Sequence, residues 1–75
     1  MLVFDYGRLR ECRRVLRLKQ KDVAAVLHCT AATVSNMENG KVRVPADDLA
    51  VLAELYKTKI NEFYVERLNY NETSK

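Results

Sequence analysis

The hydrophobic positions of the chain recur at the spacing of amphipathic helices, in five segments separated by short polar stretches. In the first segment, from about residue 5 to 16, Leu9, Cys12 and Leu16 alternate with arginines. The same spacing predicts further helices at about 19–27, 31–39, from Pro45 to about 56, and after Lys59. With only two glycines and one proline, the chain favours helices over a sandwich or barrel. The pattern predicts an all-α fold, a compact bundle of about five helices.

Local signals mark the ends of the third and fourth helices. Thr30 is a favourable N-cap immediately before the third helix, and Asn39-Gly40 is a typical helix stop. Pro45 suits the first turn of the fourth helix, where two aspartates that follow it favour the positive end of the helix dipole. The segment between Gly40 and Pro45 is therefore expected to be a loop.

The second and third helices are short and are joined by three residues, which is the spacing of a helix-turn-helix. In a twenty-residue window that begins at Gln20, the small residue Ala24 occupies the fifth position, where it lets two helices cross closely. Apolar residues occupy the other positions expected to fill the wedge between the helices: Val23, Leu27, Cys29, Val34 and Met37. Any one of these matches is weak, but together they form a fairly specific pattern.

A chain of 75 residues has room for one small domain, which we expect to span residues 1–68 and to be followed by a flexible polar tail, 69–75. Hydrophobic residues make up 48% and charged residues 31%, a globular balance. The apolar runs are too short for a transmembrane helix, and the apolar start is too short for a signal peptide. These features predict a cytoplasmic protein without a membrane partner.

The net charge of +3 is unevenly distributed. Residues 1–43 hold nine Lys/Arg and four acids, 9 − 4 = +5, whereas residues 44–75 hold four Lys/Arg and six acids, 4 − 6 = −2. A basic first half suggests a polyanionic partner, although a solvated helix face would have the same composition.

Two cysteines and one histidine are the candidates for other chemistry. Adjacent His28 and Cys29 are poorly placed for a nucleophile and base, and with Cys12 they lack the paired spacing of a metal site. A Cys12–Cys29 disulfide is disfavoured in a reducing compartment. We interpret both cysteines as reduced core residues, and we expect no catalytic residue, metal, cofactor or small-molecule ligand.

The sequence resembles the Cro/repressor-type helix-turn-helix family of phage repressors and bacterial regulators over roughly residues 6–64. The resemblance lies in residues 9–13, 20–24 and 30–41, and in 49–64, which resemble the fourth and fifth helices of the family. Three turn positions that often hold glycine in the family hold Arg17, His28 and Lys57 here, and the position of His28 requires a positive φ.

The resemblance implies a set of site residues. Bases would be read by the third helix, at Ala31, Ala32, Asn36 and Thr33. Phosphates would be held by Gln20, Ser35, Asn39, Gly40, Lys41 and Arg43. The two alanines are either plain helix formers or contacts for thymine methyl groups. A structural ion pair would join Arg13 of the first helix to Glu38 at the end of the third.

The resemblance and the charge together predict a sequence-specific regulator that binds double-stranded DNA, a repressor or an activator, and not an enzyme. The alternative is a protein-interaction module of the same fold, an antitoxin-like partner. A single reading helix covers only a half-site, so we expect a homodimer. Its interface would lie on the fifth helix, at Tyr64, Val65 and Leu68, unless these side chains only complete the core of the monomer.

Overall fold

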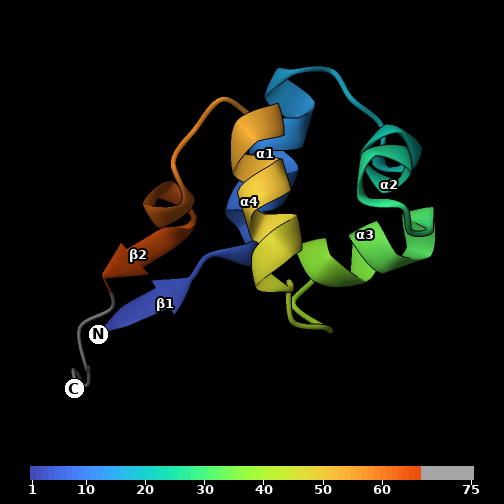
Figure 1. Cartoon of the computed structure of the whole chain (residues 1–75). Helices are drawn as coiled ribbons and strands as arrows, with labels where there is room; N and C mark the ends of the chain where they lie inside the picture. The colour runs from blue at the N-terminus through green and yellow to red at the C-terminus, as the bar shows by residue number, and fades with distance from the viewer. Residues whose placement is uncertain (67–75) are drawn as a thin grey trace.

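The structure is a computed structural model that describes residues 1–66, and it is mostly helical with one small sheet (Figure 1). Its elements, in chain order, are β1 (Leu2–Phe4), α1 (Tyr6–Val15), α2 (Gln20–Leu27), α3 (Ala31–Glu38), α4 (Ala46–Leu55), the 3-10 helix η1 (Ile60–Phe63) and β2 (Tyr64–Glu66). The first four predicted helices are therefore present, with ends within a few residues of the expected ones. Among the described residues, no helix is long and apolar enough to cross a membrane.

The prediction of a fifth α-helix, and with it the all-α class, was wrong. The segment after Lys59 forms the short η1 and then β2, which pairs antiparallel with β1 in the register Val3↔Val65. Aromatic and β-branched residues favour strands when a partner strand is available. That partner comes from the other end of the described chain, where helical spacing gives no signal. The two strands lie together at one side of the helices (Figure 1).

The ring of Phe4 connects the sheet to the helices. It makes edge contacts with the rings of Tyr6 and Tyr64, at centroid distances of 5.0 and 5.2 Å, and lies 6.1 Å from Phe63. The backbone N–H of Asp5 donates to the Phe63 carbonyl at 2.7 Å, and the Asp5 side chain then accepts from the Gly7 N–H as the N-cap of α1. The sheet thus fixes the start of α1.

One hydrophobic core lies between the helices. Its buried residues are Leu9, Val23, Ala24, Leu27, Val34, Met37, Leu49, Leu52, Ala53, Tyr56 and Phe63. Two hydrophobic residues of the predicted first and fifth helices, Leu16 and Ile60, are 41% and 42% exposed, because Leu16 follows the last residue of α1 and Ile60 opens η1. Burial raises the pKa of Tyr56 to about 12.

Both cysteines are free thiols, half-buried against the core. Burial raises the pKa of the Cys12 thiol and of the Cys29 thiol above their ordinary values. Less of each is therefore thiolate at neutral pH, which makes both poor nucleophiles.

Left-handed backbone occurs in the turns. His28 has φ 59°, which confirms the expectation for its position, and Arg17 and Lys57 have φ 58° and 55°. Gly40 also has a positive φ, 72°, and a Cβ at this position would lie 3.0 Å from the ring of Tyr6. Both the conformation and the close approach of Tyr6 therefore favour glycine after α3.

Candidate nucleic-acid interface

Helices α2 and α3 pack closely around a three-residue turn, residues 28–30. Ala24 is buried where the helices meet, and its carbonyl accepts from the Cys29 N–H at 3.0 Å. The side chain of Thr30 then accepts from the Thr33 N–H at 3.1 Å, so Thr30 caps α3 as its sequence predicts. The left-handed His28 ends α2 and redirects the chain into α3.

The first turn of α3 presents small side chains to solvent. Ala31 and Ala32 are exposed, whereas Val34 and Met37 point into the core. Asn36 lies four residues after Ala32, on the same face of the helix, and is half-buried. In the part of the chain that the structure describes, no hydrogen bond engages the Asn36 side chain, so its amide is available to a partner.

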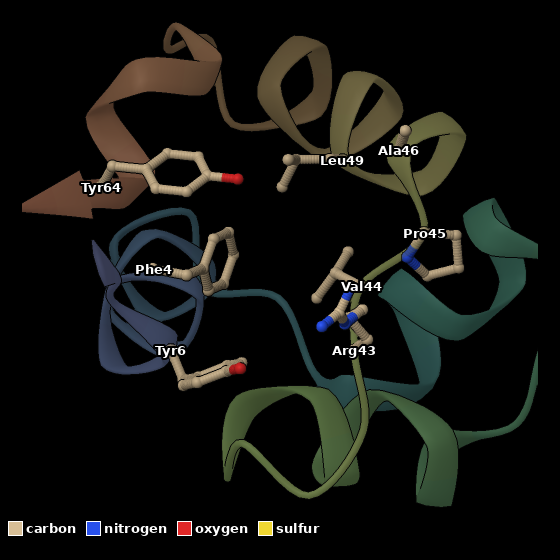
Figure 2. A pocket seen from close by; sticks show the side chains of 8 residues that line it. All are labelled: Phe4, Tyr6, Arg43, Val44, Pro45, Ala46, Leu49 and Tyr64. Atoms are coloured by element: carbon tan, nitrogen blue, oxygen red, sulfur yellow. The ribbon is translucent and has the colours of Figure 1, made fainter. Parts of the chain in front are cut away.

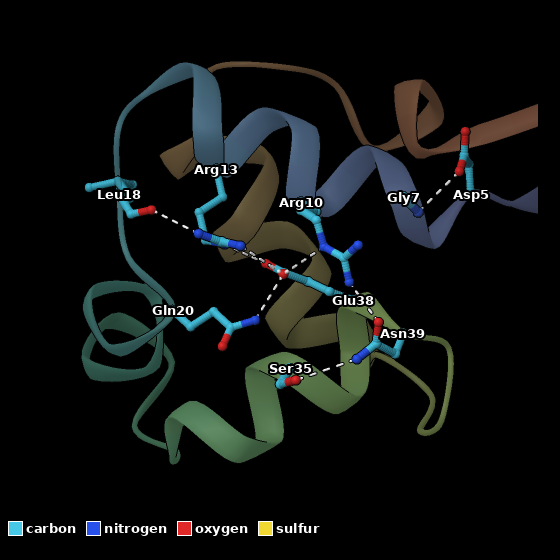
Figure 3. A network of polar contacts seen from close by, with 9 residues as sticks. All are labelled: Asp5, Gly7, Arg10, Arg13, Leu18, Gln20, Ser35, Glu38 and Asn39. Atoms are coloured by element: carbon cyan, nitrogen blue, oxygen red, sulfur yellow. Dashed lines mark hydrogen bonds and ion pairs between the residues drawn. The ribbon is translucent and has the colours of Figure 1, made fainter.

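The carboxylate of Glu38, the last residue of α3, connects three elements (Figure 3). Arg13 of α1 donates to it through Nε at 2.7 Å and Nη2 at 3.1 Å, and Gln20 of α2 donates from Nε2 at 3.1 Å. Arg13 also donates to the Leu18 carbonyl at 3.0 Å. The contact holds the end of α3 against α1 and the start of α2.

Glu38 is ionised in this setting. Its side chain is 1% exposed, and burial alone would raise its pKa. The hydrogen bonds from Arg13 and Gln20, with the charges of Arg13 and Arg10, outweigh burial and hold the pKa of Glu38 below its ordinary value. The pKa of Arg13 is raised, first by its hydrogen bond to Glu38. The negative charge of Glu38 is therefore balanced by the arginines around it and is not presented to a partner.

A second polar chain runs from α1 to the outer face of α3. Arg10 donates from Nη2 to Asn39 Oδ1 at 2.6 Å, and Asn39 donates from Nδ2 to Ser35 Oγ at 3.4 Å (Figure 3). The guanidinium of Arg10 also lies 3.6 Å from Glu38 and is partly exposed. Arg10 was not singled out from the sequence, because nothing distinguishes it from the other arginines of α1 until the helix crossing is known.

The residues expected to hold phosphates come from α2, from α3 and from the segment after α3. Gln20 opens α2, Ser35 lies within α3, and the others follow α3 in the order Asn39, Gly40, Lys41 and Arg43. The last four are exposed. Three side chains of the set already have intramolecular partners, since Gln20 donates to Glu38, Asn39 accepts from Arg10, and Ser35 accepts from Asn39. Gln20 keeps a second amide N–H for another acceptor.

Arg43 also lines a cavity of about 480 Å³ between the sheet and the start of α4 (Figure 2). The rings of Phe4, Tyr6 and Tyr64 form one wall.

Of the residues expected at a dimer interface, Tyr64 is 36% exposed and Val65 is half-buried, both in β2 instead of a helix. Leu68 lies outside the described residues.

Comparisons with known proteins agree with this geometry. A family model described as "Helix-turn-helix domain" matches residues 7–63. The fold is similar to that of the P22 c2 repressor protein, solved in complex with synthetic operator 9T in the presence of Tl⁺. That likeness has a TM-score of 0.72 at 16% sequence identity and covers 77% of this chain and 88% of the repressor chain. No curated protein matches the chain.

Proposed function

Since the chain belongs to the helix-turn-helix domain family, we propose that it is a transcription regulator of the Cro/repressor type that binds double-stranded DNA at specific sequences. In this proposal α3 lies in the major groove and reads bases with Ala31, Ala32, Thr33 and Asn36. The regulator acts as a repressor, and two copies bind the two halves of one site.

One observation carries the proposal: side-chain contacts fix both ends of α3 while the start of its outer face is exposed to solvent. Glu38 fixes the end of α3 to Arg13 and Gln20, and Thr30 caps its start. The exposed Ala31 and Ala32 leave nothing bulky between the start of the helix and a groove. A helix that is already ordered before it binds can enter a groove with a smaller loss of conformational entropy.

The charges around α3 suit a polyanion. Glu38 is the only acid of the helix and is neutralised, whereas Arg10, Lys41 and Arg43 lie beside or after its end. Side-chain donors of Gln20, Ser35, Asn39, Lys41 and Arg43 would hold the phosphates that flank the bases. Gly40 would contribute by letting the backbone approach a phosphate closely, because its N–H already donates to the Met37 carbonyl at 3.2 Å. Such contacts set the register of α3 on the duplex.

Selection of bound sites from random duplex DNA, followed by a titration of the selected site at two salt concentrations, tests the proposal. We expect a defined site and an affinity that falls by a factor of about 10³ or more between low and physiological salt, as for six or more phosphate contacts per dimer. An interaction module of the same fold would select no site and would show no steep salt dependence.

A further inference from the structure

The outer face of α3 offers methyl groups and one free amide. Residues four apart on a helix lie in rows. One row holds Ala31 and Ser35 and ends at the C-cap Asn39, and the adjacent row holds Ala32 and Asn36. The side chains that enter a groove first, those of Ala31 and Ala32, are single methyl groups without a donor or acceptor.

The hydroxyl and amide groups near these methyls are already engaged with each other. Thr33 Oγ1 lies 3.0 Å from Thr30 Oγ1, which also caps the helix. Asn39 donates to Ser35 and accepts from Arg10 of α1. The polar groups of Ser35 and Asn39 are therefore partly engaged within the protein. Among residues 1–66, Asn36 is the side chain on this face whose donors and acceptor are both unengaged.

These two facts define the base edge that α3 fits. In the major groove, a thymine carries a methyl group, and an adenine presents the N6 donor and N7 acceptor that match an Asn amide. A G·C pair lacks this methyl group, since cytosine carries only a hydrogen at C5, and its edge presents the N7 and O6 acceptors of guanine and the N4 donor of cytosine. Packed against the Ala31 and Ala32 methyls, those polar groups would lose water without gaining a partner.

Resting on the function proposed above, we infer that α3 reads A·T base pairs, with Ala31 and Ala32 packed on thymine methyl groups and Asn36 bonded to an adenine. Discrimination at the alanine contacts comes from apolar burial. Direct hydrogen-bond readout is confined to the adenine contact.

Deoxyuridine tests the methyl contacts, since it differs from thymidine by the methyl group alone. The selected site is scanned with deoxyuridine at each thymidine in turn, and the dissociation constant is measured at one salt concentration. We expect at least one position in each half-site where the substitution weakens binding roughly fourfold, the loss for one buried methyl group. Replacing that T·A pair by a C·G pair should weaken binding further, and 5-methylcytosine in the C·G pair should recover part of the lost affinity.

Variants assign the methyl contacts to α3. In Ala31→Gly and Ala32→Gly the deoxyuridine effect should shrink, because the protein methyl that packs on the thymine is gone. Ala50→Gly, at an exposed alanine of α4, controls for the effect of glycine on helix stability and should keep the full deoxyuridine effect. Asn36→Ala should remove the preference for adenine at one position and leave the deoxyuridine effect unchanged.

The outcomes separate this inference from the proposed function. A selected site that is rich in G·C pairs, or one that tolerates deoxyuridine everywhere, overturns the methyl readout and leaves sequence-specific DNA binding intact. If no duplex is selected and binding has no salt dependence, the proposed function and the inference both fail.

Discussion

The guanidinium of Arg13 and the carboxylate of Glu38 face each other through two hydrogen bonds, of 2.7 and 3.1 Å, and join α1 to the last residue of α3. Their side chains are 11% and 1% exposed. Such a pair is costly to break, because the remaining partner stays buried without its counter-charge. The pair fixes the orientation of the helix that carries Ala31, Ala32 and Asn36.

Removal of either partner should destabilise the fold strongly. We expect Arg13→Met and Glu38→Leu each to lower the free energy of unfolding by about 3 kcal/mol, and the double variant to recover part of that loss. Urea unfolding followed by circular dichroism measures all three. Arg14→Met, at the exposed neighbouring arginine, is the matched control and should change stability by less than about 0.5 kcal/mol. Additive losses in the double variant would contradict the coupling.

The same pair predicts a loss of stability in acid. The pKa of Glu38 is lower in the folded protein than in the unfolded chain, because hydrogen bonds from Arg13 and Gln20 and nearby arginine charges outweigh burial. Its contribution is therefore complete above the unfolded pKa, about 4.3, and is lost as the pH falls through the folded value. Urea midpoints between pH 7 and pH 3 should fall more steeply for the wild type than for Glu38→Gln. Parallel curves would show that Glu38 is not the group responsible.

The helix-turn-helix could be predicted from sequence because its signals are local. Val23, Val34 and Met37 recur at helical spacing, and Thr30 caps α3 within one turn. The sheet could not be predicted, because Val3 and Val65 pair from opposite ends of the described chain. Strand pairing depends on contacts that a local pattern does not contain, so the helical spacing after Lys59 predicts a helix where η1 and β2 form.

The candidate site, like the fold, was predictable only where its signals are local. The pattern identifies which residues of α3 face outward, since Val34 and Met37 fix the inner face. The hydrophobic pattern alone does not show which arginines of α1 reach Glu38 at the end of α3. The resemblance indicates Arg13, which does contact Glu38, but nothing in the sequence indicates Arg10, which also lies near it. Such contacts depend on the angle at which α1 and α3 cross.

Replacing residues in left-handed turns by glycine should stabilise the protein. Arg17 and Lys57 have φ 58° and 55°, a conformation that costs a residue with a Cβ about 1–2 kcal/mol. Part of the gain is offset by the greater freedom of glycine in the unfolded chain, so we expect Arg17→Gly and Lys57→Gly each to add about 0.5–1 kcal/mol. Arg17→Ala keeps the Cβ and removes the charge, and should add nothing. The urea midpoints of unfolding of the variants test this prediction. Equal increases in stability for the Arg17→Gly and Arg17→Ala variants would show that the loss of charge, and not the backbone conformation, is responsible.

Residues of α3 and of the loop after it should differ in their effect on DNA binding. Asn36→Ala should weaken the selected site by about 1–3 kcal/mol and relax the preference at one base pair. Lys41→Ala should weaken all duplexes about equally and reduce the slope of log affinity against log salt by about 1 per contact. Both variants are measured on the selected site and on an unrelated duplex. An Asn36→Ala variant with unchanged affinity and site would contradict the docking of α3.

The protein should be a dimer whose interface includes β2. One α3 covers a few base pairs, and two half-sites about one turn apart give useful discrimination only when a two-fold dimer reads both. The interface must lie away from α3 and use the same patch of both copies. Tyr64 fits this position, because it is partly exposed on β2, which is separated from α3 by α4 (Figure 1), and tyrosines are enriched at interfaces. The outer edges of the two-stranded sheet also offer backbone groups to a second copy.

Sedimentation velocity at micromolar concentration tests the dimer, with the fold of each variant checked by circular dichroism. Wild type should sediment as a dimer, and Tyr64→Asp as a folded monomer, since a buried charge in a self-complementary patch meets its own copy. Val51→Asp is the matched control: Val51 is 37% exposed, nearly the same as Tyr64, but lies on α4. If Val51→Asp were monomeric and Tyr64→Asp dimeric, the interface would lie on α4 and not on β2, because the introduced aspartate disrupts association only where the interface buries it. A monomeric wild type would leave each α3 to bind a half-site alone, and DNA binding would then lack the steep concentration dependence of two linked half-sites.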